Sequence, residues 1–182
     1  MVTFVAKPIP FLDLKKAYLK DKRLFDSAYQ RVMDSGRWIL GTELDSFEKE
    51  FAQYLDVKHL IGVSNGLDAL QLSLRALDIG AGSKVLVPAH TFIATWLAIE
   101  AVGAVPVPIE PSNDSYLPSC KDYIDRILDG ASAVIVVHLY GQLDDLTPLK
   151  EKCTQLNIPL IEDAAQAHGA RISGVGCGQF GK

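Results

Sequence analysis

Short apolar runs alternate with amphipathic stretches along most of the chain, and this alternation predicts strands and helices in turn. The apolar runs are rich in β-branched or small residues, and they predict strands over 60–63, 85–87, 105–109, 133–137 and 158–161. Between these runs apolar side chains recur at helical spacing, which predicts helices over 67–77, 91–102, 121–128 and 148–156. Strands separated by helices are typical of a mostly parallel sheet flanked by helices, so the expected fold class is α/β.

The pattern differs before residue 60. Residues 1–12 form an apolar, proline-punctuated arm for which no regular element is expected. A helix is predicted over 20–35 with Gly36 as its stop, and Thr42 is predicted to start the next helix through an acidic variant of the capping box. The apolar stripe of that second helix consists of Leu44, Phe47, Phe51 and Leu55. The arm is therefore set apart from one large domain over 13–182.

Length, composition and charge fit an ordinary globular protein. With 182 residues, 48% of them apolar and 22% charged, the chain can bury a core without disulfides or a structural metal. The net charge of −4 favours neither nucleic acid nor an anionic membrane as a partner, and no apolar run approaches the ~20 residues that span a bilayer. Cysteines and histidines lack metal-ligand spacing, and the chain does not start like a signal peptide. We therefore expect reduced thiols, no metal and a cytoplasmic location.

Two carboxylates and two further polar residues follow the last predicted strand. Glu162 and Asp163 stand at its carboxyl end, and Gln166 and His168 come shortly afterwards. In open α/β sheets, ligands bind beyond the carboxyl ends of the strands. A carboxylate beside apolar sheet is costly unless a cationic or protonated group faces it. Taken alone, the stretch is equally compatible with Asp163 capping a turn or a helix start.

A glycine turn follows the first predicted strand, in the order Ser64-Asn65-Gly66-Leu67. A helix that starts there offers unpaired N–H groups and a positive dipole end to a phosphate, and Gly66 lets a ligand approach the backbone closely. Asn-Gly is also common in ordinary turns, so this stretch alone supports either interpretation.

Two more strand ends carry aromatic residues and a histidine. Phe92 follows His90 in the segment after the second predicted strand, and an aromatic ring there either stacks on a planar ligand or fills the core. The fourth strand leads into His138-Leu139-Tyr140-Gly141-Gln142. The sequence does not decide whether His138 acts in chemistry or is only hydrogen-bonded, and we favour the second.

These stretches resemble the large domain of fold-type I pyridoxal-phosphate aminotransferases, in particular the DegT-type sugar aminotransferases. The resemblance rests on Asp-Ala-Ala-Gln-Ala-His-Gly over 163–169, on the turn at Gly66 and on His-Leu-Tyr-Gly-Gln over 138–142. It extends from Ile9 to about Arg171, which is nearly the whole chain. The expected fold is accordingly the large domain of a pyridoxal-phosphate transferase.

The resemblance implies roles for five residues in binding pyridoxal 5'-phosphate. Asp163 faces the pyridine nitrogen and, as a carboxylate, keeps it protonated, which makes the ring an electron sink. Gln166 reaches the phenolic oxygen of the ring or nearby chemistry. Backbone N–H groups at Gly66 and Leu67 hold the phosphate, with Leu67 in place of the usual hydroxyl residue, and Phe92 covers the ring. We therefore expect Asp163 and Gln166 to be catalytic and all five residues to contact the cofactor.

The resemblance also implies a two-stage amino transfer. Glutamate loads the cofactor with an amino group, and a keto-sugar nucleotide then takes it. The amino-acid sequence of residues 64–70 and 138–142 is most similar to that of members that aminate dTDP-3-keto-6-deoxyhexoses. Related enzymes are homodimers, so a homodimer is expected for the intact protein.

The Schiff-base lysine of the family has no counterpart in this chain. In the family it lies shortly beyond the Gly-rich segment, in a Ser-Phe-x-x-x-Lys type of stretch, whereas Lys182 falls where members tend to carry an acidic residue. We therefore expect a large domain that is truncated at its C-terminus, lacks the small C-terminal domain and is inactive alone.

Two other interpretations stay open. A non-catalytic remnant, or a regulatory or binding protein, could use the same scaffold. A nucleotide-dependent oxidoreductase is suggested by the glycines in Gly176-Cys177-Gly178-Gln179-Phe180-Gly181. That fingerprint requires a strand before it and a helix after it, which the chain does not supply, and the turn after the first predicted strand lacks it.

Overall fold

The computed structural model describes residues 9–182. The chain divides into two compact units, Met1–Phe47 and Glu48–Lys182, and each is described by itself. The predicted arm over 1–12 lies mostly outside the described residues, and the domain boundary after it stays a prediction.

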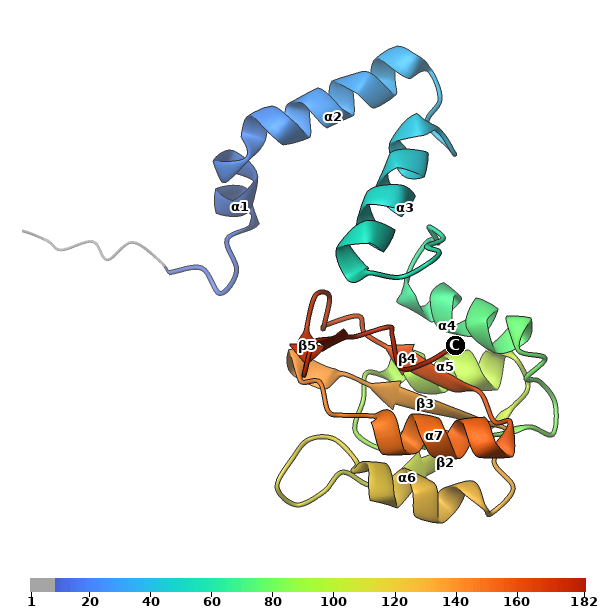
Figure 1. The fold of residues 1–182 in the computed structure, drawn as a ribbon. Coiled ribbons are helices and arrows are strands. Elements are labelled where there is room, and N and C mark those ends of the chain that lie inside the picture. Colours follow the sequence, from blue (N-terminus) through green and yellow to red (C-terminus); the bar gives the residue numbers. More distant parts are fainter. Residues whose placement is uncertain (1–8) are drawn as a thin grey trace, which may run out of the picture. The chain divides into compact units, whose positions relative to one another are not determined.

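The first unit is helical. α1 (Leu14–Lys20) and α2 (Lys22–Ser35) contain no buried residue, and α3 (Thr42–Leu55) begins at the end of this unit (Figure 1). Gly36 ends α2 in the left-handed conformation with φ 64°, which confirms the predicted stop.

The helix predicted from Thr42 is confirmed, but its predicted cap is wrong. Thr42 is already helical, and the carbonyl of Gly41 accepts the first hydrogen bond of the helix from the N–H of Asp45 at 3.0 Å. The cap position therefore falls to Gly41, which has no side chain to offer. Glu43 instead forms a two-pronged ion pair with Arg31, whose Nε and Nη2 lie 2.7 and 2.9 Å from the carboxylate oxygens.

The second unit contains a four-stranded parallel sheet in the order β2-β1-β3-β4. The strands are β1 (Lys84–Pro88), β2 (Val105–Ile109), β3 (Ala133–Val137) and β4 (Leu160–Asp163). The helices that alternate with them are α4 (Gly66–Ala76), α5 (Ile93–Ala101), α6 (Cys120–Ile127) and α7 (Thr147–Leu156). A single 3-10 turn, η1 (Leu139–Gly141), follows β3, and an antiparallel hairpin of β5 (Arg171–Ile172) and β6 (Val175–Gly176) follows β4. The parallel α/β architecture predicted from the alternating pattern is confirmed.

Helices cover both faces of this sheet (Figure 1). Alternate residues of each strand point to opposite faces, and the buried residues divide accordingly. Val85 and Val87 of β1 pack with Leu74 of α4 and Ile99 of α5. Between them in β1, Leu86 packs on the other face with residues of α6 and α7. This explains why the interior residues 85–87 and 133–136 are continuously apolar rather than alternating.

The strand predicted over 60–63 is wrong. No described residue pairs with this segment in a ladder, and Ile61 is 79% exposed. The N–H of Gly62 donates instead to a side chain, Oε1 of Glu48, at 2.7 Å. An apolar β-branched run becomes a strand only where a neighbouring strand supplies hydrogen-bond partners.

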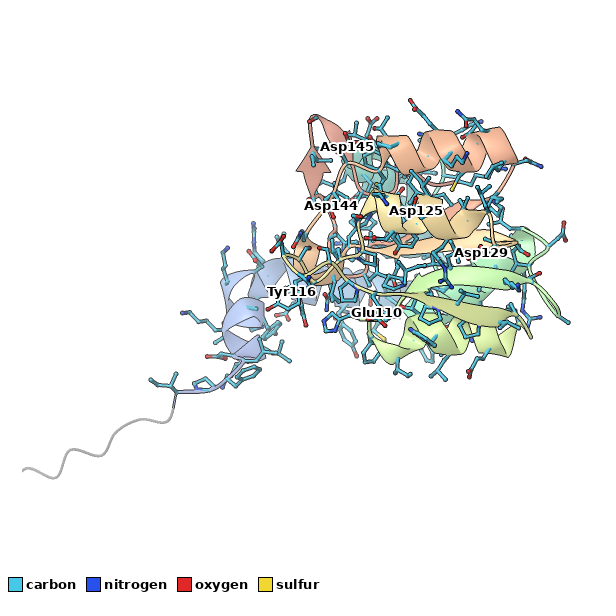
Figure 2. The ribbon with its side chains drawn as sticks, turned by 90° about the horizontal axis from the view of Figure 1, so that it is seen from below. Glu110, Tyr116, Asp125, Asp129, Asp144 and Asp145 are labelled. Atoms are coloured by element: carbon cyan, nitrogen blue, oxygen red, sulfur yellow. The ribbon has the colours of Figure 1, made fainter. Side chains whose placement is uncertain are left out.

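The surface of the second unit carries several acidic side chains. Figure 2 labels Glu110, Asp125, Asp129, Asp144 and Asp145, which come from the segment after β2, from α6 and its end, and from the loop before α7.

Across residues 9–182, no His, Cys, Asp and Glu side chains form a group of three that could hold a metal ion. Within the same range no helix is both long and apolar enough to cross a membrane.

Candidate functional site

A cavity of about 490 Å³ opens where the carboxyl ends of β3 and β4 meet the N-terminal ends of α4 and α5. This volume lies in the range of roughly 300–1,000 Å³ that is typical of small-molecule sites. All five residues expected to contact a cofactor line it, namely Gly66, Leu67, Phe92, Asp163 and Gln166. The structure thus brings together residues that are up to 100 positions apart in the sequence.

The N-terminus of α4 faces this cavity. Asn65 caps the helix, and its Oδ1 accepts from the N–H of Asp68 at 2.9 Å. Side chains of Ser64 and Asn65 in turn donate to Oδ2 of Asp68, which draws this carboxylate into the cap. No described residue accepts from the N–H groups of Gly66 and Leu67, as expected for the first turn of a helix. Two backbone donors and the positive end of the helix dipole are therefore available to an anion in the cavity.

Gly66 leaves open space at this point. A Cβ built on Gly66 meets no atom within 4 Å, and its φ is not in the left-handed region. Neither the conformation nor the packing of the described residues requires glycine at this position. The open space at Gly66 therefore leaves the backbone of this helix end accessible from the cavity that Gly66 lines.

Asp163 lines the same cavity from the end of β4. Its Oδ2 accepts from Oγ1 of Thr95 at 3.2 Å, and its Oδ1 accepts from the N–H of Ala165 at 3.2 Å. Thr95 is fully buried in the first turn of α5, and its hydroxyl lies 3.0 Å from that of Thr91, which precedes the helix. These contacts fix the direction of the carboxylate, while Asp163 still lines the cavity. No helix follows Asp163, but its contact with the N–H two residues on caps the turn after β4, so the turn-capping alternative also holds while the carboxylate lines the cavity.

Phe92 stands at the rim with 72% of its surface exposed. It is the residue before α5, in extended conformation with φ −67° and ψ 143°. Its exposure excludes the interpretation as a core residue of this chain. An exposed ring on a cavity wall is suited to cover a planar ligand.

Three more aromatic rings gather beside this rim. His90 lies 5.8 Å from Tyr116 and 6.4 Å from Tyr140 between ring centroids, and the two tyrosines meet edge to face at 5.6 Å. Tyr116, labelled in Figure 2, comes from the loop after β2 and is 62% exposed. A hydrogen bond of 3.1 Å from Nε2 of Gln142 to Oγ of Ser115 ties this loop to the segment after β3.

Gln166 orients the turn after β3. Its Oε1 accepts from the N–H of Tyr140 at 2.7 Å, and Tyr140 itself is left-handed with φ 58°. A Cβ on Gly141, whose φ is 81°, would lie 3.1 Å from the carbonyl oxygen of Gln166. Glycine is favoured at position 141 by its conformation, and a side chain there would also require the backbone at Gln166 to shift slightly. No described residue accepts from Nε2 of Gln166, so the amide group keeps a donor for a ligand in the cavity.

His138 and Glu162 form a buried pair in the wall behind the cavity. Nε2 of His138 lies 2.9 Å from Oε2 of Glu162, and both side chains are 2% exposed. Burial raises the pKa of the Glu162 carboxyl, but the hydrogen bonds from His138 and from the N–H groups of Gly181 and Gly178 outweigh it, and the pKa stays below its ordinary value. The preference for a hydrogen-bonded His138 agrees with this geometry. His168 does not line the cavity, and its ring packs against Phe51 with centroids 5.6 Å apart.

Two parts of this arrangement were not predicted from sequence. Thr95 was not assigned to Asp163, and the contact of its hydroxyl with that of Thr91 could not be derived from helical spacing, because Thr91 precedes α5. The partner of Glu162 was not named either. The only available signal was that a carboxylate beside apolar sheet requires a donor.

Comparison with known proteins decides the family. The profile of the DegT/DnrJ/EryC1/StrS aminotransferase family matches residues 20–182. The chain belongs to this family. A solved structure of DesV from S. venezuelae, in complex with a ketimine intermediate, is 48% identical and superposes with a TM-score of 0.86, covering 90% of this chain and 44% of that one.

Two curated members of the DegT/DnrJ/EryC1/StrS family illustrate the similarity. The dTDP-3-amino-3,4,6-trideoxy-alpha-D-glucose transaminase of Streptomyces venezuelae is 49% identical over 168 residues, which are 91% of this chain and 44% of that protein. The dTDP-3-amino-3,6-dideoxy-alpha-D-galactopyranose transaminase of Aneurinibacillus thermoaerophilus is 45% identical, over 95% of this chain and 48% of that protein. The chain thus spans about half the length of the curated relatives that it matches.

Proposed function

We propose that this chain supplies the pyridoxal-phosphate-binding part of an aminotransferase that moves an amino group from glutamate to a keto-sugar nucleotide. The observation that carries the proposal is the convergence of one free helix N-terminus and one oriented carboxylate on a single cavity. A phosphorylated, nitrogen-containing ring needs both of these groups, one at each end.

The residues of the cavity fit the cofactor. The N–H groups of Gly66 and Leu67 would hold its phosphate, Phe92 would cover the ring, and Asp163 would face the pyridine nitrogen. When bound, pyridoxal phosphate supplies an electron sink for the carbon that gains or loses the amino group. Thr95 holds the Asp163 carboxylate in the orientation in which it lines the cavity, so no reorganisation energy is needed to orient it when a ligand binds. Gln166 offers its free amide N–H to the edge of the ring.

The substrate class is proposed from the relatives. Two members with 49% and 45% identity are named for dTDP-linked amino-deoxysugars, so we propose a dTDP-3-keto-6-deoxyhexose as amino acceptor. Homodimer formation, a cytoplasmic location and the lack of nucleic-acid or membrane partners belong to the same proposal. The covalent lysine is not assigned to any residue of this chain.

The test uses the natural protein that contains this chain, with added pyridoxal phosphate, glutamate and a dTDP-3-keto-6-deoxyhexose. Formation of 2-oxoglutarate and of the amino sugar is followed by mass spectrometry. Asp163→Asn should lower turnover by about 100-fold or more, the scale of losing one charge-stabilising contact. The matched control is Asp125→Asn, which removes an exposed carboxylate paired with Lys121 on α6 and should leave turnover within about twofold.

Two outcomes would contradict the proposal. Wild-type turnover in Asp163→Asn would show that this carboxylate does not serve the ring. Tight binding of pyridoxal phosphate without transfer to any keto-sugar nucleotide would instead favour a binding or regulatory protein on the same scaffold.

A further inference from the structure

The Glu162 carboxylate accepts hydrogen bonds from four separate donors. Oε1 accepts from the N–H groups of Phe180 at 2.8 Å and Gly181 at 2.6 Å. Oε2 accepts from the N–H of Gly178 at 3.0 Å and lies 2.9 Å from Nε2 of His138. A carboxylate offers about four lone-pair sites, so every site of Glu162 is occupied.

Three of these donors come from one segment, Gly178–Lys182. The segment lies against β4, because the N–H of Lys182 donates to the carbonyl of Leu160 at 2.9 Å. A Cβ on Gly181 would lie 2.8 Å from that same oxygen, which leaves room only for glycine. Phe180 is 4% exposed and packs in the core under α7. Glu162 therefore joins this segment to the strand that carries Asp163.

The fourth donor belongs to the wall of the cavity. His138 lines the cavity, and its backbone N–H donates to the carbonyl of Asp163 at 3.0 Å. Both oxygens of Glu162 already accept from backbone N–H groups, and a carboxylate has no proton to give. Nε2 of His138 must therefore carry the hydrogen of their contact.

We propose that Glu162 is a positioning residue that holds His138 in the form protonated at Nε2 and ties the Gly178–Lys182 segment to the same wall. Neighbouring carboxylates thereby have separate tasks, since Asp163 faces the cavity and Glu162 organises what surrounds it. The inference concerns the wall of the proposed cofactor cavity but does not depend on what the cavity binds. It is therefore tested without measuring activity.

The variant Glu162→Gln replaces one acceptor by a donor. In the orientation that keeps more of the backbone hydrogen bonds, the amide oxygen accepts from Phe180 and Gly181, and the NH₂ group takes the place of Oε2. There it loses the hydrogen bond from Gly178 and donates to Nε2 of His138. His138 then moves its proton to Nδ1. A hydrogen bond to a charged group contributes about 1.5–3 kcal/mol, so the ratio of the two His138 forms should change by about 10- to 150-fold.

The experiment is ¹⁵N NMR of the histidine side chains in the natural protein at pH 7.5, together with amide hydrogen exchange. Wild type should show Nε2 of His138 protonated, and Glu162→Gln should show the proton on Nδ1 and exchange at residues 178–181 at least about 10-fold faster. His138→Gln should leave that exchange near wild type, because three backbone donors remain on the carboxylate. Glu151→Gln, an exposed carboxylate on α7, is the matched control and should change neither reading.

Either of two results would overturn the proposal. The first is an unprotonated Nε2 of His138 in the wild-type protein. The second is a Glu162→Gln variant with the wild-type His138 form and exchange rates within about twofold. If Glu162→Gln does not fold, two other measurements test the proposal: the ¹⁵N shifts of His138 in the wild-type protein and the amide exchange rates of His138→Gln. Faster exchange at residues 178–181 in His138→Gln would show that His138, and not Glu162, holds the segment.

Discussion

The substitution Gly66→Ala separates what the fold needs at the N-terminus of α4 from what a ligand needs. Gly66 is the first residue of α4, has no left-handed φ and would place a Cβ with no atom within 4 Å. Alanine loses less backbone entropy than glycine when it becomes helical. The ligand-free protein should therefore be as stable as wild type, or more stable by about 0.4–1 kcal/mol.

The same methyl group should weaken binding of pyridoxal phosphate. It would occupy the open space in front of the N–H groups of Gly66 and Leu67, and keep a phosphate from reaching at least one of them. A hydrogen bond to a charged acceptor is worth about 1.5–3 kcal/mol, so the dissociation constant should rise by about 10- to 150-fold. The opposite signs of the two effects are the diagnostic feature, because a general disturbance of the fold would lower both stability and affinity.

The assay is an absorbance titration of the natural protein with pyridoxal phosphate, paired with urea unfolding in the absence of ligand. Gly80→Ala is the matched control, because Gly80 lies outside the cavity and its Cβ would meet only the carbonyl of Val102, at an ordinary 3.6 Å. A Gly66→Ala variant that binds pyridoxal phosphate as wild type does would refute the assignment of the phosphate to this helix end.

Three further predictions concern the core, a thiol and the response to acid. Leu74→Ala, at a fully buried position of α4, should lower the free energy of unfolding in urea by about 2–5 kcal/mol, whereas Leu72→Ala on the exposed side of the helix should change it by less than about 0.5 kcal/mol. Burial raises the pKa of the Cys153 thiol to about 11, so at pH 8 only about one molecule in a thousand carries the thiolate, and labelling by a disulfide reagent should be slow until denaturant is added. The pKa of Glu162 is lowered, so its stabilisation is present above the ordinary value of 4.5 and is lost as pH falls through the lower folded value. Urea unfolding at pH 3 and pH 7 should therefore show that acid lowers the free energy of unfolding less in Glu162→Gln than in wild type. An equal decrease in both proteins would contradict a lowered pKa of Glu162.

Much of the second unit could be predicted because its local signals agree with its packing. The runs over 105–109 and 133–137 are strands with those same bounds in the structure. The run over 133–137 is apolar throughout because β3 lies inside the sheet with helices on both faces, whereas 105–109 is the edge strand β2, where Val105 is 51% exposed. Gly36 ended its helix as predicted because glycine pays no steric penalty for a positive φ.

The errors arise where an element depends on partners that are distant in the sequence. The segment 60–63 has the composition of a strand but no described neighbour to pair with. The hairpin of β5 and β6 was missed for the opposite reason, since two-residue strands have no period that a pattern can reveal. Thr42 has the right type for a cap, yet the chain begins the helix one position earlier than that role requires.

The site could be predicted as a set of residues but not as a set of contacts. Gly66, Phe92 and Asp163 each follow a predicted strand or precede a predicted helix, and parallel strand ends meet at one edge of a sheet. Which side chain orients which depends on distances across the sheet. Thr95 and Asp163 are 68 positions apart in the sequence, and no local pattern connects them.

The alternation along β4 explains how two adjacent carboxylates come to serve different purposes. Leu160 packs with α6 and α7, and Ile161 packs on the other face with α4 and α5. By the same alternation Glu162 faces the side of α7 and the Gly178–Lys182 segment, and Asp163 faces the side of α5, where Thr95 meets it. A shift of one residue in the register of β4 would exchange these faces, placing Asp163 against backbone donors and Glu162 in the cavity. The buried hydrogen bonds of Glu162 therefore do more than satisfy one carboxylate, because they hold the register that keeps Asp163 in the site.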